Sequence, residues 1–239
     1  PTENWKTNMS STFTVPLRLN TRQTTSNDGT ISADTTHLAE GAHAGSILDG
    51  SNVINSSLAV EALTVSAKGV DSTAELLLDD INQINIDSTL ILASADGALA
   101  QLNITSTDIH PASIAFNNMT QITANGDRAE AKLTISSDAT ISFDALNVNT
   151  TGNGSDASAT LSITTSSDIY FNGSIDLNAS SDNSEINFSV DSLNATAYLS
   201  QDLDITASNS SEINVTFSGS TDLSGNLTAT ASLNSDVNI

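Results

Sequence analysis

Hydrophobic and polar residues alternate along most of this chain from about residue 55 onward. In one representative stretch the apolar positions are Ala129, Ala131, Leu133, Ile135, Ile141, Phe143 and Ala145. Mostly Ser, Thr, Asn, Asp and Glu fill the positions between them. An alternation of period two places one row of side chains in a core and the other in water, which is the pattern of a half-buried β-strand. The pattern argues against a helical fold.

The same design returns further along the chain, in copies that begin near Ala157, Ile186 and Ile213. Turn-forming pairs separate the copies at intervals of about 27 to 29 residues. They are Asp96-Gly97, Asn125-Gly126, Asn153-Gly154, Asp182-Asn183 and Asn209-Ser210. Asn, Asp and Gly suit such places because they tolerate left-handed backbone angles. A fixed period in this range is typical of repeat proteins, so we expect an all-β, β-solenoid-like array of about 28 residues per unit.

A second architecture fits the same pattern. Asn-Gly and Asp-Gly pairs are strong hairpin formers, which favours a long antiparallel meander, sandwich or barrel. Side chains of equal size at matching positions, such as Leu133 with Leu161 and Phe143 with Phe171, favour the stacked ladders of a solenoid instead. We prefer the solenoid and keep the antiparallel form as the alternative.

The first 50 residues differ from the rest and are expected to form an N-terminal arm, with residues 51–239 as the β-repeat domain. Within the arm, Phe13–Leu19 alternates like a strand. Pro16 cannot donate a ladder hydrogen bond, which confines this strand to an edge or to the sheet of a partner. The segment His37–Gly50 is rich in small residues and is expected to be a linker.

Composition narrows the function classes. The chain has 239 residues, of which 38% are hydrophobic and 4% aromatic, and its formal net charge is −22. Such an acidic surface repels nucleic acid and anionic membranes, so we expect neither as a partner. No apolar run approaches the roughly 18 residues of a membrane helix, and we expect no membrane span. The absence of cysteine excludes disulfides and thiolate metal sites.

The charge is unevenly distributed, and this suggests self-assembly. Residues 1–26 carry a net charge of +2, from Lys6, Arg18 and Arg22 against Glu3, while the remainder carries −24. A basic, apolar strand can dock on the acidic body of the next subunit by β-augmentation, and a head-to-tail contact that does not close produces a filament. The candidate assembly residues are Phe13, Val15, Leu17, Arg18, Leu19 and Arg22. The alternative is that this strand pairs within its own chain.

Signals for catalysis and for metals are weak. His37, His43 and His110 are scattered, and carboxylates are so frequent that no pair carries weight as a catalytic dyad. We therefore expect no enzymatic activity and no cofactor. Two groups of carboxylates could supply oxygen ligands to calcium. The known calcium-loop patterns are missing, and an interpretation as solvated turn residues explains both groups better. The groups are Asp79 with Asp80 and Asp87, and Asp182 with Glu185.

Asn-x-Ser/Thr sequons are frequent, as in secreted glycoproteins, and the alternative is that the abundance of Ser and Thr produces such matches by chance. Besides Asn8 and Asn55, the glycosylation candidates are Asn103, Asn118, Asn149, Asn153, Asn172, Asn178, Asn187, Asn194, Asn209, Asn214 and Asn226. A chain that opens on Pro1 rather than Met fits a processed, exported product. We expect an extracellular, cell-surface location.

The alternating Ser/Thr/Asn-rich segments ATLSITTSSDIYFNGSIDLNAS (159–180) and SEINVTFSGSTDLSGNLTATASLN (211–234) resemble repeats of large secreted prokaryotic β-solenoid adhesins of the filamentous-haemagglutinin type. The resemblance covers about residues 55–239 and implies a role in attachment or matrix building. Together these features predict a structural subunit of an extracellular filament, sheath or matrix, with the chain itself as partner. The alternatives are a monomeric adhesin or a module that binds cell-surface glycans, and then a polysaccharide-cleaving β-helix.

Overall fold

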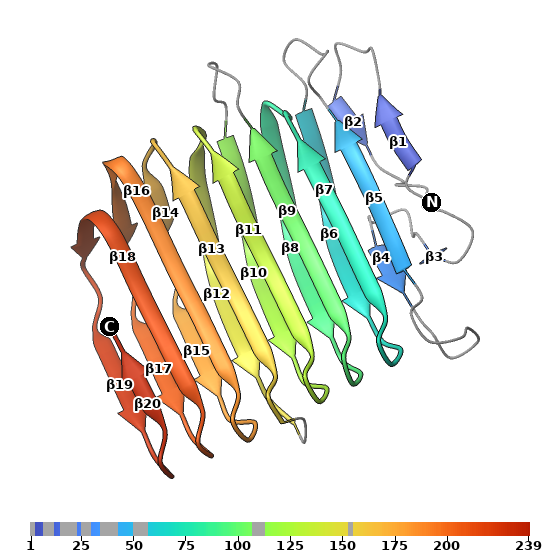
Figure 1. Cartoon of the computed structure of the whole chain (residues 1–239). Coiled ribbons are helices and arrows are strands. Elements are labelled where there is room, and N and C mark those ends of the chain that lie inside the picture. Colours follow the sequence, from blue (N-terminus) through green and yellow to red (C-terminus); the bar gives the residue numbers. More distant parts are fainter. Residues whose placement is uncertain are drawn as a thin grey trace.

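The computed structural model describes residues 57–106, 113–152 and 155–239, together with the backbone of five short strands nearer the N-terminus. Within these residues the fold is all-β, and twenty strands form one continuous hydrogen-bonded array. Most strands pair with the second or third strand after them in the chain rather than with the next one, and every pairing except β3 with β4 is parallel. This is the topology of a β-solenoid, in which each turn of the chain stacks on the turn before it (Figure 1).

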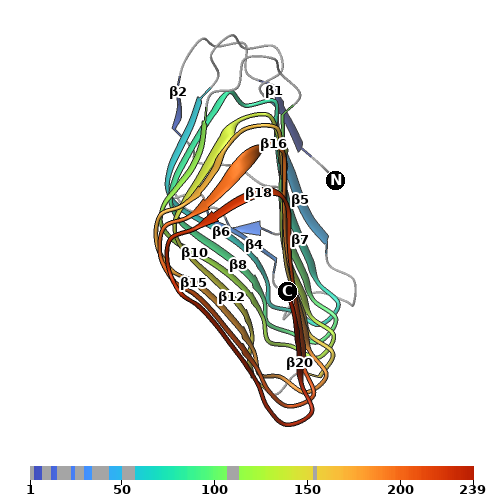
Figure 2. The same cartoon turned by 90° about the vertical axis from the view of Figure 1, so that its left-hand side faces the viewer.

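Viewed along the stack, the solenoid has one straight side and one bent side (Figure 2). The straight side, here the flat face, contains β1 (Glu3–Lys6), β5 (His43–Asp49), β7 (Thr73–Asp79), β9 (Leu99–Ser106), β11 (Glu130–Ser137), β13 (Ser158–Thr165), the first halves of β16 (Glu185–Leu199) and β18 (Glu212–Leu223), and β20 (Asp236–Asn238).

The bent side, here the bent face, is made of the strands that alternate with these. It contains β2 (Thr12–Thr14), β4 (Thr30–Ala33), β6 (Ser57–Ala67), β8 (Gln83–Ala93), β10 (Ser113–Ala124), β12 (Thr140–Thr150), β14 (Ile169–Phe171), β15 (Ile175–Ala179), the second halves of β16 and β18, β17 (Leu203–Ala207) and β19 (Leu227–Ala231). The remaining strand, β3 (Gln23–Thr24), pairs antiparallel with β4.

The register confirms the repeat that the sequence predicts. Glu130 of β11 pairs with Ser158 of β13, and Ser158 pairs with Glu185 of β16, so these turns take 28 and 27 residues. From β5 onward the other turns range from 24 to 31 residues. Because all the strands of the repeat are parallel, the solenoid is confirmed and the antiparallel meander, sandwich or barrel is wrong.

The core consists of columns of like side chains, one from each turn. Leu102, Leu133 and Leu161 follow one another in register on the flat face, each with no exposed surface. On the bent face Phe116, Phe143 and Phe171 form a second column of buried side chains. Each fully buried side chain of this size contributes roughly 1.5–3 kcal/mol relative to an exposed one. The narrow interior is thereby filled mainly with aliphatic residues and this row of rings, to which the buried Phe188 of the flat face adds, with its centroid 6.0 Å from that of Phe171.

At one edge of the solenoid the turns that join the bent face to the flat face lie above one another, with a left-handed residue in each. This residue is Gly97 in one turn and Asn183 in another, with φ of 66° and 51°. Their backbone N–H groups donate to the carbonyl oxygens of Asp127 and Asn209 in the following turn. The predicted turn pairs therefore mark real turns, although Asn153-Gly154 lies outside the described residues.

Two strands of the N-terminal arm bear on the predicted boundaries. β2 pairs in parallel with β6 of the same chain, with Phe13 opposite Leu58. β5 falls within the segment expected to be a linker, and its seven residues pair in register with β7. The arm thus contributes strands to the first turns of its own solenoid.

Candidate functional site

The C-terminal turn, defined here as Ser220–Ile239, leaves core positions uncovered. Leu223 and Leu227 occupy the same columns as Leu199 and Leu203 of the previous turn. The earlier pair is 2% exposed, whereas Leu223 and Leu227 are 40% and 45% exposed. The end of the stack therefore presents both apolar core residues and an unpaired parallel strand edge (Figure 1).

A polar column on the flat face leads to this end. The Nδ2 group of Asn214 donates to Oδ1 of Asn187 at 3.2 Å and to Oε1 of Glu185 at 3.3 Å. One turn later Asn238 Nδ2 donates to Oδ1 of Asn214 at 2.9 Å and to Oε1 of Glu212 at 3.0 Å. Because each amide donates backwards to the previous turn, the last oxygen of the column, Asn238 Oδ1, accepts no hydrogen bond from a described residue.

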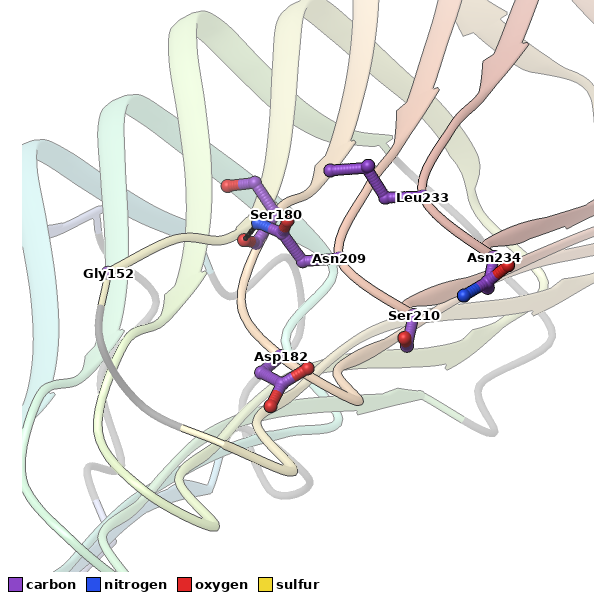
Figure 3. A pocket seen from close by; sticks show the side chains of 7 residues that line it. All are labelled: Gly152, Ser180, Asp182, Asn209, Ser210, Leu233 and Asn234. Carbon is purple, nitrogen blue, oxygen red and sulfur yellow. Dashed lines mark hydrogen bonds between the residues drawn. The ribbon is translucent and has the colours of Figure 1, made fainter.

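The stacked turns at the edge of the solenoid enclose a shallow, mostly polar depression of about 560 Å³. It runs across four successive turns, with Ser180, Asn209 and Leu233 along one side and Asp182, Ser210 and Asn234 along the other (Figure 3). Gly152 closes one end of it. Asn209 Nδ2 donates to the Ser180 carbonyl oxygen at 2.8 Å, which ties two of these turns together.

Two tyrosines form an aromatic pair on the outside of the bent face. Tyr170 and Tyr198 are partners in adjacent turns, and their rings stack with centroids 5.1 Å apart. The Tyr170 hydroxyl donates to Asp168 Oδ2 at 3.4 Å, and Asp168 Oδ1 accepts the Thr196 N–H at 2.9 Å. The pKa of Tyr170 lies above its ordinary value, first because surrounding atoms exclude water and then because the Asp168 carboxylate disfavours a phenolate.

A pair of carboxylates lies on the outside of the bent face, one turn apart. Asp176 of β15 is the register partner of Asp204 of β17. Partial burial raises the pKa of Asp176, and the like charge of Asp204 adds to the effect. The neighbour of Asp176 on the other side is Asn147, whose buried Oδ1 accepts no hydrogen bond from a described residue.

Of the predicted assembly residues, only Phe13 lies in a described strand. Its backbone pairs with Leu58 of the same chain. The other predicted residues of the joint lie outside the described residues; they are Val15, Leu17, Arg18, Leu19 and Arg22. The structure therefore places the start of the arm on its own sheet at the N-terminal end of the stack.

The carboxylates considered for calcium are dispersed. Asp79 ends β7 and accepts a hydrogen bond from the Thr105 hydroxyl of the next turn, whereas Asp87 lies in β8 on the other face. Asp182 lines the depression and Glu185 begins β16. Within the part of the chain that the structure describes, no three His, Asp or Glu side chains come together as a metal site would require.

The sequons divide between strands and corners. Those within regular strand pairing are Asn103, Asn149, Asn178, Asn187 and Asn214. Those at bulges, corners or turns are Asn118, Asn172, Asn194, Asn209 and Asn226. Asn153 lies outside the described residues.

Comparisons with protein-family models, with curated proteins and with solved structures gave no match to this chain. The described residues include no helix with the length and hydropathy of a membrane span.

Sequence reasoning did not find the tyrosine pair or the open C-terminal turn. The two tyrosines lie 28 residues apart, which is the length of the repeat. Residues at that separation stack in adjacent turns, so the spacing could have predicted their contact. The exposure of Leu223 and Leu227 depends on what stacks beyond them, and the alternation pattern is the same in buried and exposed turns.

Proposed function

We propose that this protein is a structural, non-enzymatic subunit of an extracellular filament, sheath or matrix, and that its copies stack head to tail. In this arrangement the C-terminal turn of one copy packs against the N-terminal strands of the next. The solenoid then continues across the joint, with parallel strand pairing and a continuous core.

The observation that carries the proposal is the parallel, in-register stacking of the turns, in which core columns and strand edges run the length of the solenoid and can continue into another copy. In the last described turn, Leu223 and Leu227 continue the columns of the buried Leu199 and Leu203 and are 40% and 45% exposed, beside a strand edge. Exposed apolar residues next to an open edge favour association with another strand. At the opposite end, β1 and β2 are the outermost described strands of the two faces, and each pairs in parallel with one described strand.

The distribution of charge along the chain also supports head-to-tail stacking. The first 26 residues carry +2, and the remainder of the chain carries −24. A head-to-tail contact brings the basic arm of one copy to the acidic end of another, which favours encounter at low ionic strength. A contact between two C-terminal turns brings like charges together.

Negative-stain electron microscopy of the full chain over a range of protein concentrations tests the proposal. We expect unbranched filaments that lengthen with concentration and shorten as salt is added. Single rods at every concentration and salt would overturn it. Deleting the arm is a poor test, because β1 and β2 also belong to the first turns of the chain's own solenoid.

The tyrosine pair favours a second candidate function, a monomeric adhesin that binds glycans. Aromatic rings on a rigid surface are a common contact for sugars, and Tyr170 and Tyr198 form such a surface next to Asp168. Binding to a glycan array that is lost in Tyr198→Ala and retained in Thr228→Ala would favour it. Equal binding by both variants would count against it.

A further inference from the structure

The exposure of the sequon asparagines differs systematically with their place in the fold. The half-buried ones are the five in paired strands: Asn103, Asn149, Asn178, Asn187 and Asn214. The exposed ones are the five at bulges, corners and turns: Asn118, Asn172, Asn194, Asn209 and Asn226. An N-linked glycan needs its asparagine amide to project into solvent. The exposed asparagines can therefore accept a glycan more readily than the half-buried ones.

The strand sequons are unsuited to carry sugar in the folded protein. Asn214 Nδ2 donates to both Asn187 and Glu185, and a glycan on this nitrogen would take one of its two hydrogens. Asn149 and Asn178 are register partners in neighbouring strands, which lie about 4.8 Å apart. A pyranose ring on one of them cannot fit beside the side chain of the other without opening the column.

Hydrogen bonding divides the exposed group further. Asn209 Nδ2 donates to the Ser180 carbonyl oxygen at 2.8 Å, and Asn226 Nδ2 donates to Asp202 Oδ1 at 2.9 Å. Each of these amides links two turns of the stack. By contrast, the carboxamides of Asn118, Asn172 and Asn194 make no hydrogen bond to any described residue.

We infer that, among the described sequons, Asn118, Asn172 and Asn194 are the positions that accept N-linked glycans. In the reaction, the amide nitrogen bonds to C1 of an oligosaccharide carried on a polyprenyl diphosphate. The bond from C1 to the phosphate oxygen breaks, the polyprenyl diphosphate leaves, and the nitrogen loses one proton. The inference rests on the exported location in the proposed function and is independent of assembly.

The backbone at these sites has features that hold the acceptor outward. Asn118 lies in the β10 bulge, where the register shifts between Phe116 and Met119. Asn194 lies in the β16 bulge, between Ser192 and Thr196, with φ of 62°. Such bulges turn a side chain away from the sheet and from its strand neighbours.

The positions also leave room between the glycans. Asn118 and Asn172 lie at the same corner of the bent face, with Asp144 of the intervening turn between them. Two strand spacings, about 10 Å, therefore separate the acceptors along the stack. Asn194 lies at a different edge, where β16 passes from the flat face to the bent face (Figure 2). All three acceptors therefore lie off the flat face and outside the C-terminal turn, which is compatible with end-to-end stacking.

To test the inference, the full chain is secreted from a eukaryotic host behind an added signal peptide. Enzymatic deglycosylation in ¹⁸O-water then labels each asparagine that carried a glycan, and mass spectrometry locates the label. We expect label at Asn118, Asn172 and Asn194 and none at the five strand sequons. Asn118→Gln, Asn172→Gln and Asn194→Gln should each remove one glycan mass, whereas the matched Asn187→Gln should remove none. Label at Asn187 or Asn214 in folded, secreted protein would overturn the inference, as would three unlabelled acceptor sites. Glycan occupancy is measured on individual chains. A failure of the protein to form filaments would therefore not change this result.

A second measurement applies to unglycosylated protein and does not depend on secretion. Asn118→Gln, Asn172→Gln and Asn194→Gly should leave the urea midpoint of unfolding unchanged, because these amides bond to no described residue and glycine suits the left-handed backbone of Asn194. Asn214→Ala should lower it, because the column through Asn187 and Asn238 is broken. A loss of stability in the first three variants equal to that in Asn214→Ala would show that the acceptor amides are structural and would contradict the inference.

Discussion

The rings of Phe143 and Phe171 stack with their centroids 5.4 Å apart and their planes 8° from parallel, although one full turn of chain separates them. Phe116 extends the stack on the other side at 4.6 Å. All three side chains are 1% exposed. The column shows how the solenoid forms a core with few aromatic residues: each ring covers the face of the ring in the next turn.

The Phe143 ring should therefore be one of the most costly side chains to remove. We expect Phe143→Ala to lower the free energy of unfolding by about 3–5 kcal/mol, because it leaves a cavity between two rings. Urea denaturation followed by circular dichroism measures the loss. Ser142→Ala, an outward-facing change next to it in β12, serves as the control and should change stability by less than about 0.5 kcal/mol. Equal losses in the two variants would contradict the stacked core.

The turn at Gly97 requires a left-handed backbone, with φ of 66°. A Cβ atom there would meet Oδ1 of Asp71 at 2.2 Å. We expect Gly97→Ala to cost about 1–2 kcal/mol, whereas Asn183→Gly at the equivalent place in a later turn should be nearly neutral. Thermal unfolding of both variants provides the comparison. A neutral Gly97→Ala would show that this turn is not left-handed in solution.

Thr89 and Thr120 are inward-facing neighbours whose hydroxyls have no hydrogen-bond partner among the described residues. Their column is otherwise aliphatic, with Leu63 and Leu146 on either side. Because a buried hydroxyl without a partner costs free energy, we expect Thr89→Val to raise the free energy of unfolding by about 1 kcal/mol. Thr228→Val on the exposed surface of β19 is the control. Destabilisation by Thr89→Val would indicate that the hydroxyl has a partner after all.

Asp176 gives the stability a defined dependence on pH. Its pKa in the folded state is raised above the ordinary value of 3.8, so the folded state binds this proton more tightly than the unfolded chain does. The contribution of Asp176 is therefore fully present below the unfolded pKa and is lost as pH rises through the folded pKa. We expect Asp176→Asn to raise the urea midpoint at neutral pH, with the gain shrinking as pH falls towards about 4.

Asp222→Asn is the matched control for that comparison, since it removes one negative charge from an exposed position. A gain of equal size in both variants would mean that net charge, rather than the partial burial of Asp176 and its pairing with Asp204, sets the pH dependence.

Much of the fold was predictable from the sequence. The alternation around Leu133 predicts β11 and β12, and the size match of Phe143 with Phe171 predicts their stacking, because in a solenoid equal positions in successive turns are in contact. The pair Asp96-Gly97 predicts a turn, but the same pair suits a hairpin and a solenoid turn equally. The choice between them depends on pairing across about 28 residues, which local chemistry does not encode.

The candidate sites were less predictable, for related reasons. Sequons at Asn118 and Asn187 look alike in sequence, and they differ only because a bulge turns the first outward while strand pairing holds the second in a column. The uncovered state of Leu227 follows from its place at the end of the stack rather than from its neighbours in the chain. The column through Asp176 and Asp204 likewise appears only once the register is known.

The most direct test of head-to-tail stacking places a charge in the joint. Ala229 lies in the buried column of Ile205 but is exposed in the C-terminal turn, whereas its neighbour Thr228 faces outward beside Asp204. We would compare Ala229→Lys with Thr228→Lys by sedimentation velocity. The account predicts that Ala229→Lys sediments as single rods while Thr228→Lys assembles like the parent chain. Assembly by both variants, or by neither the variants nor the parent chain, would contradict it.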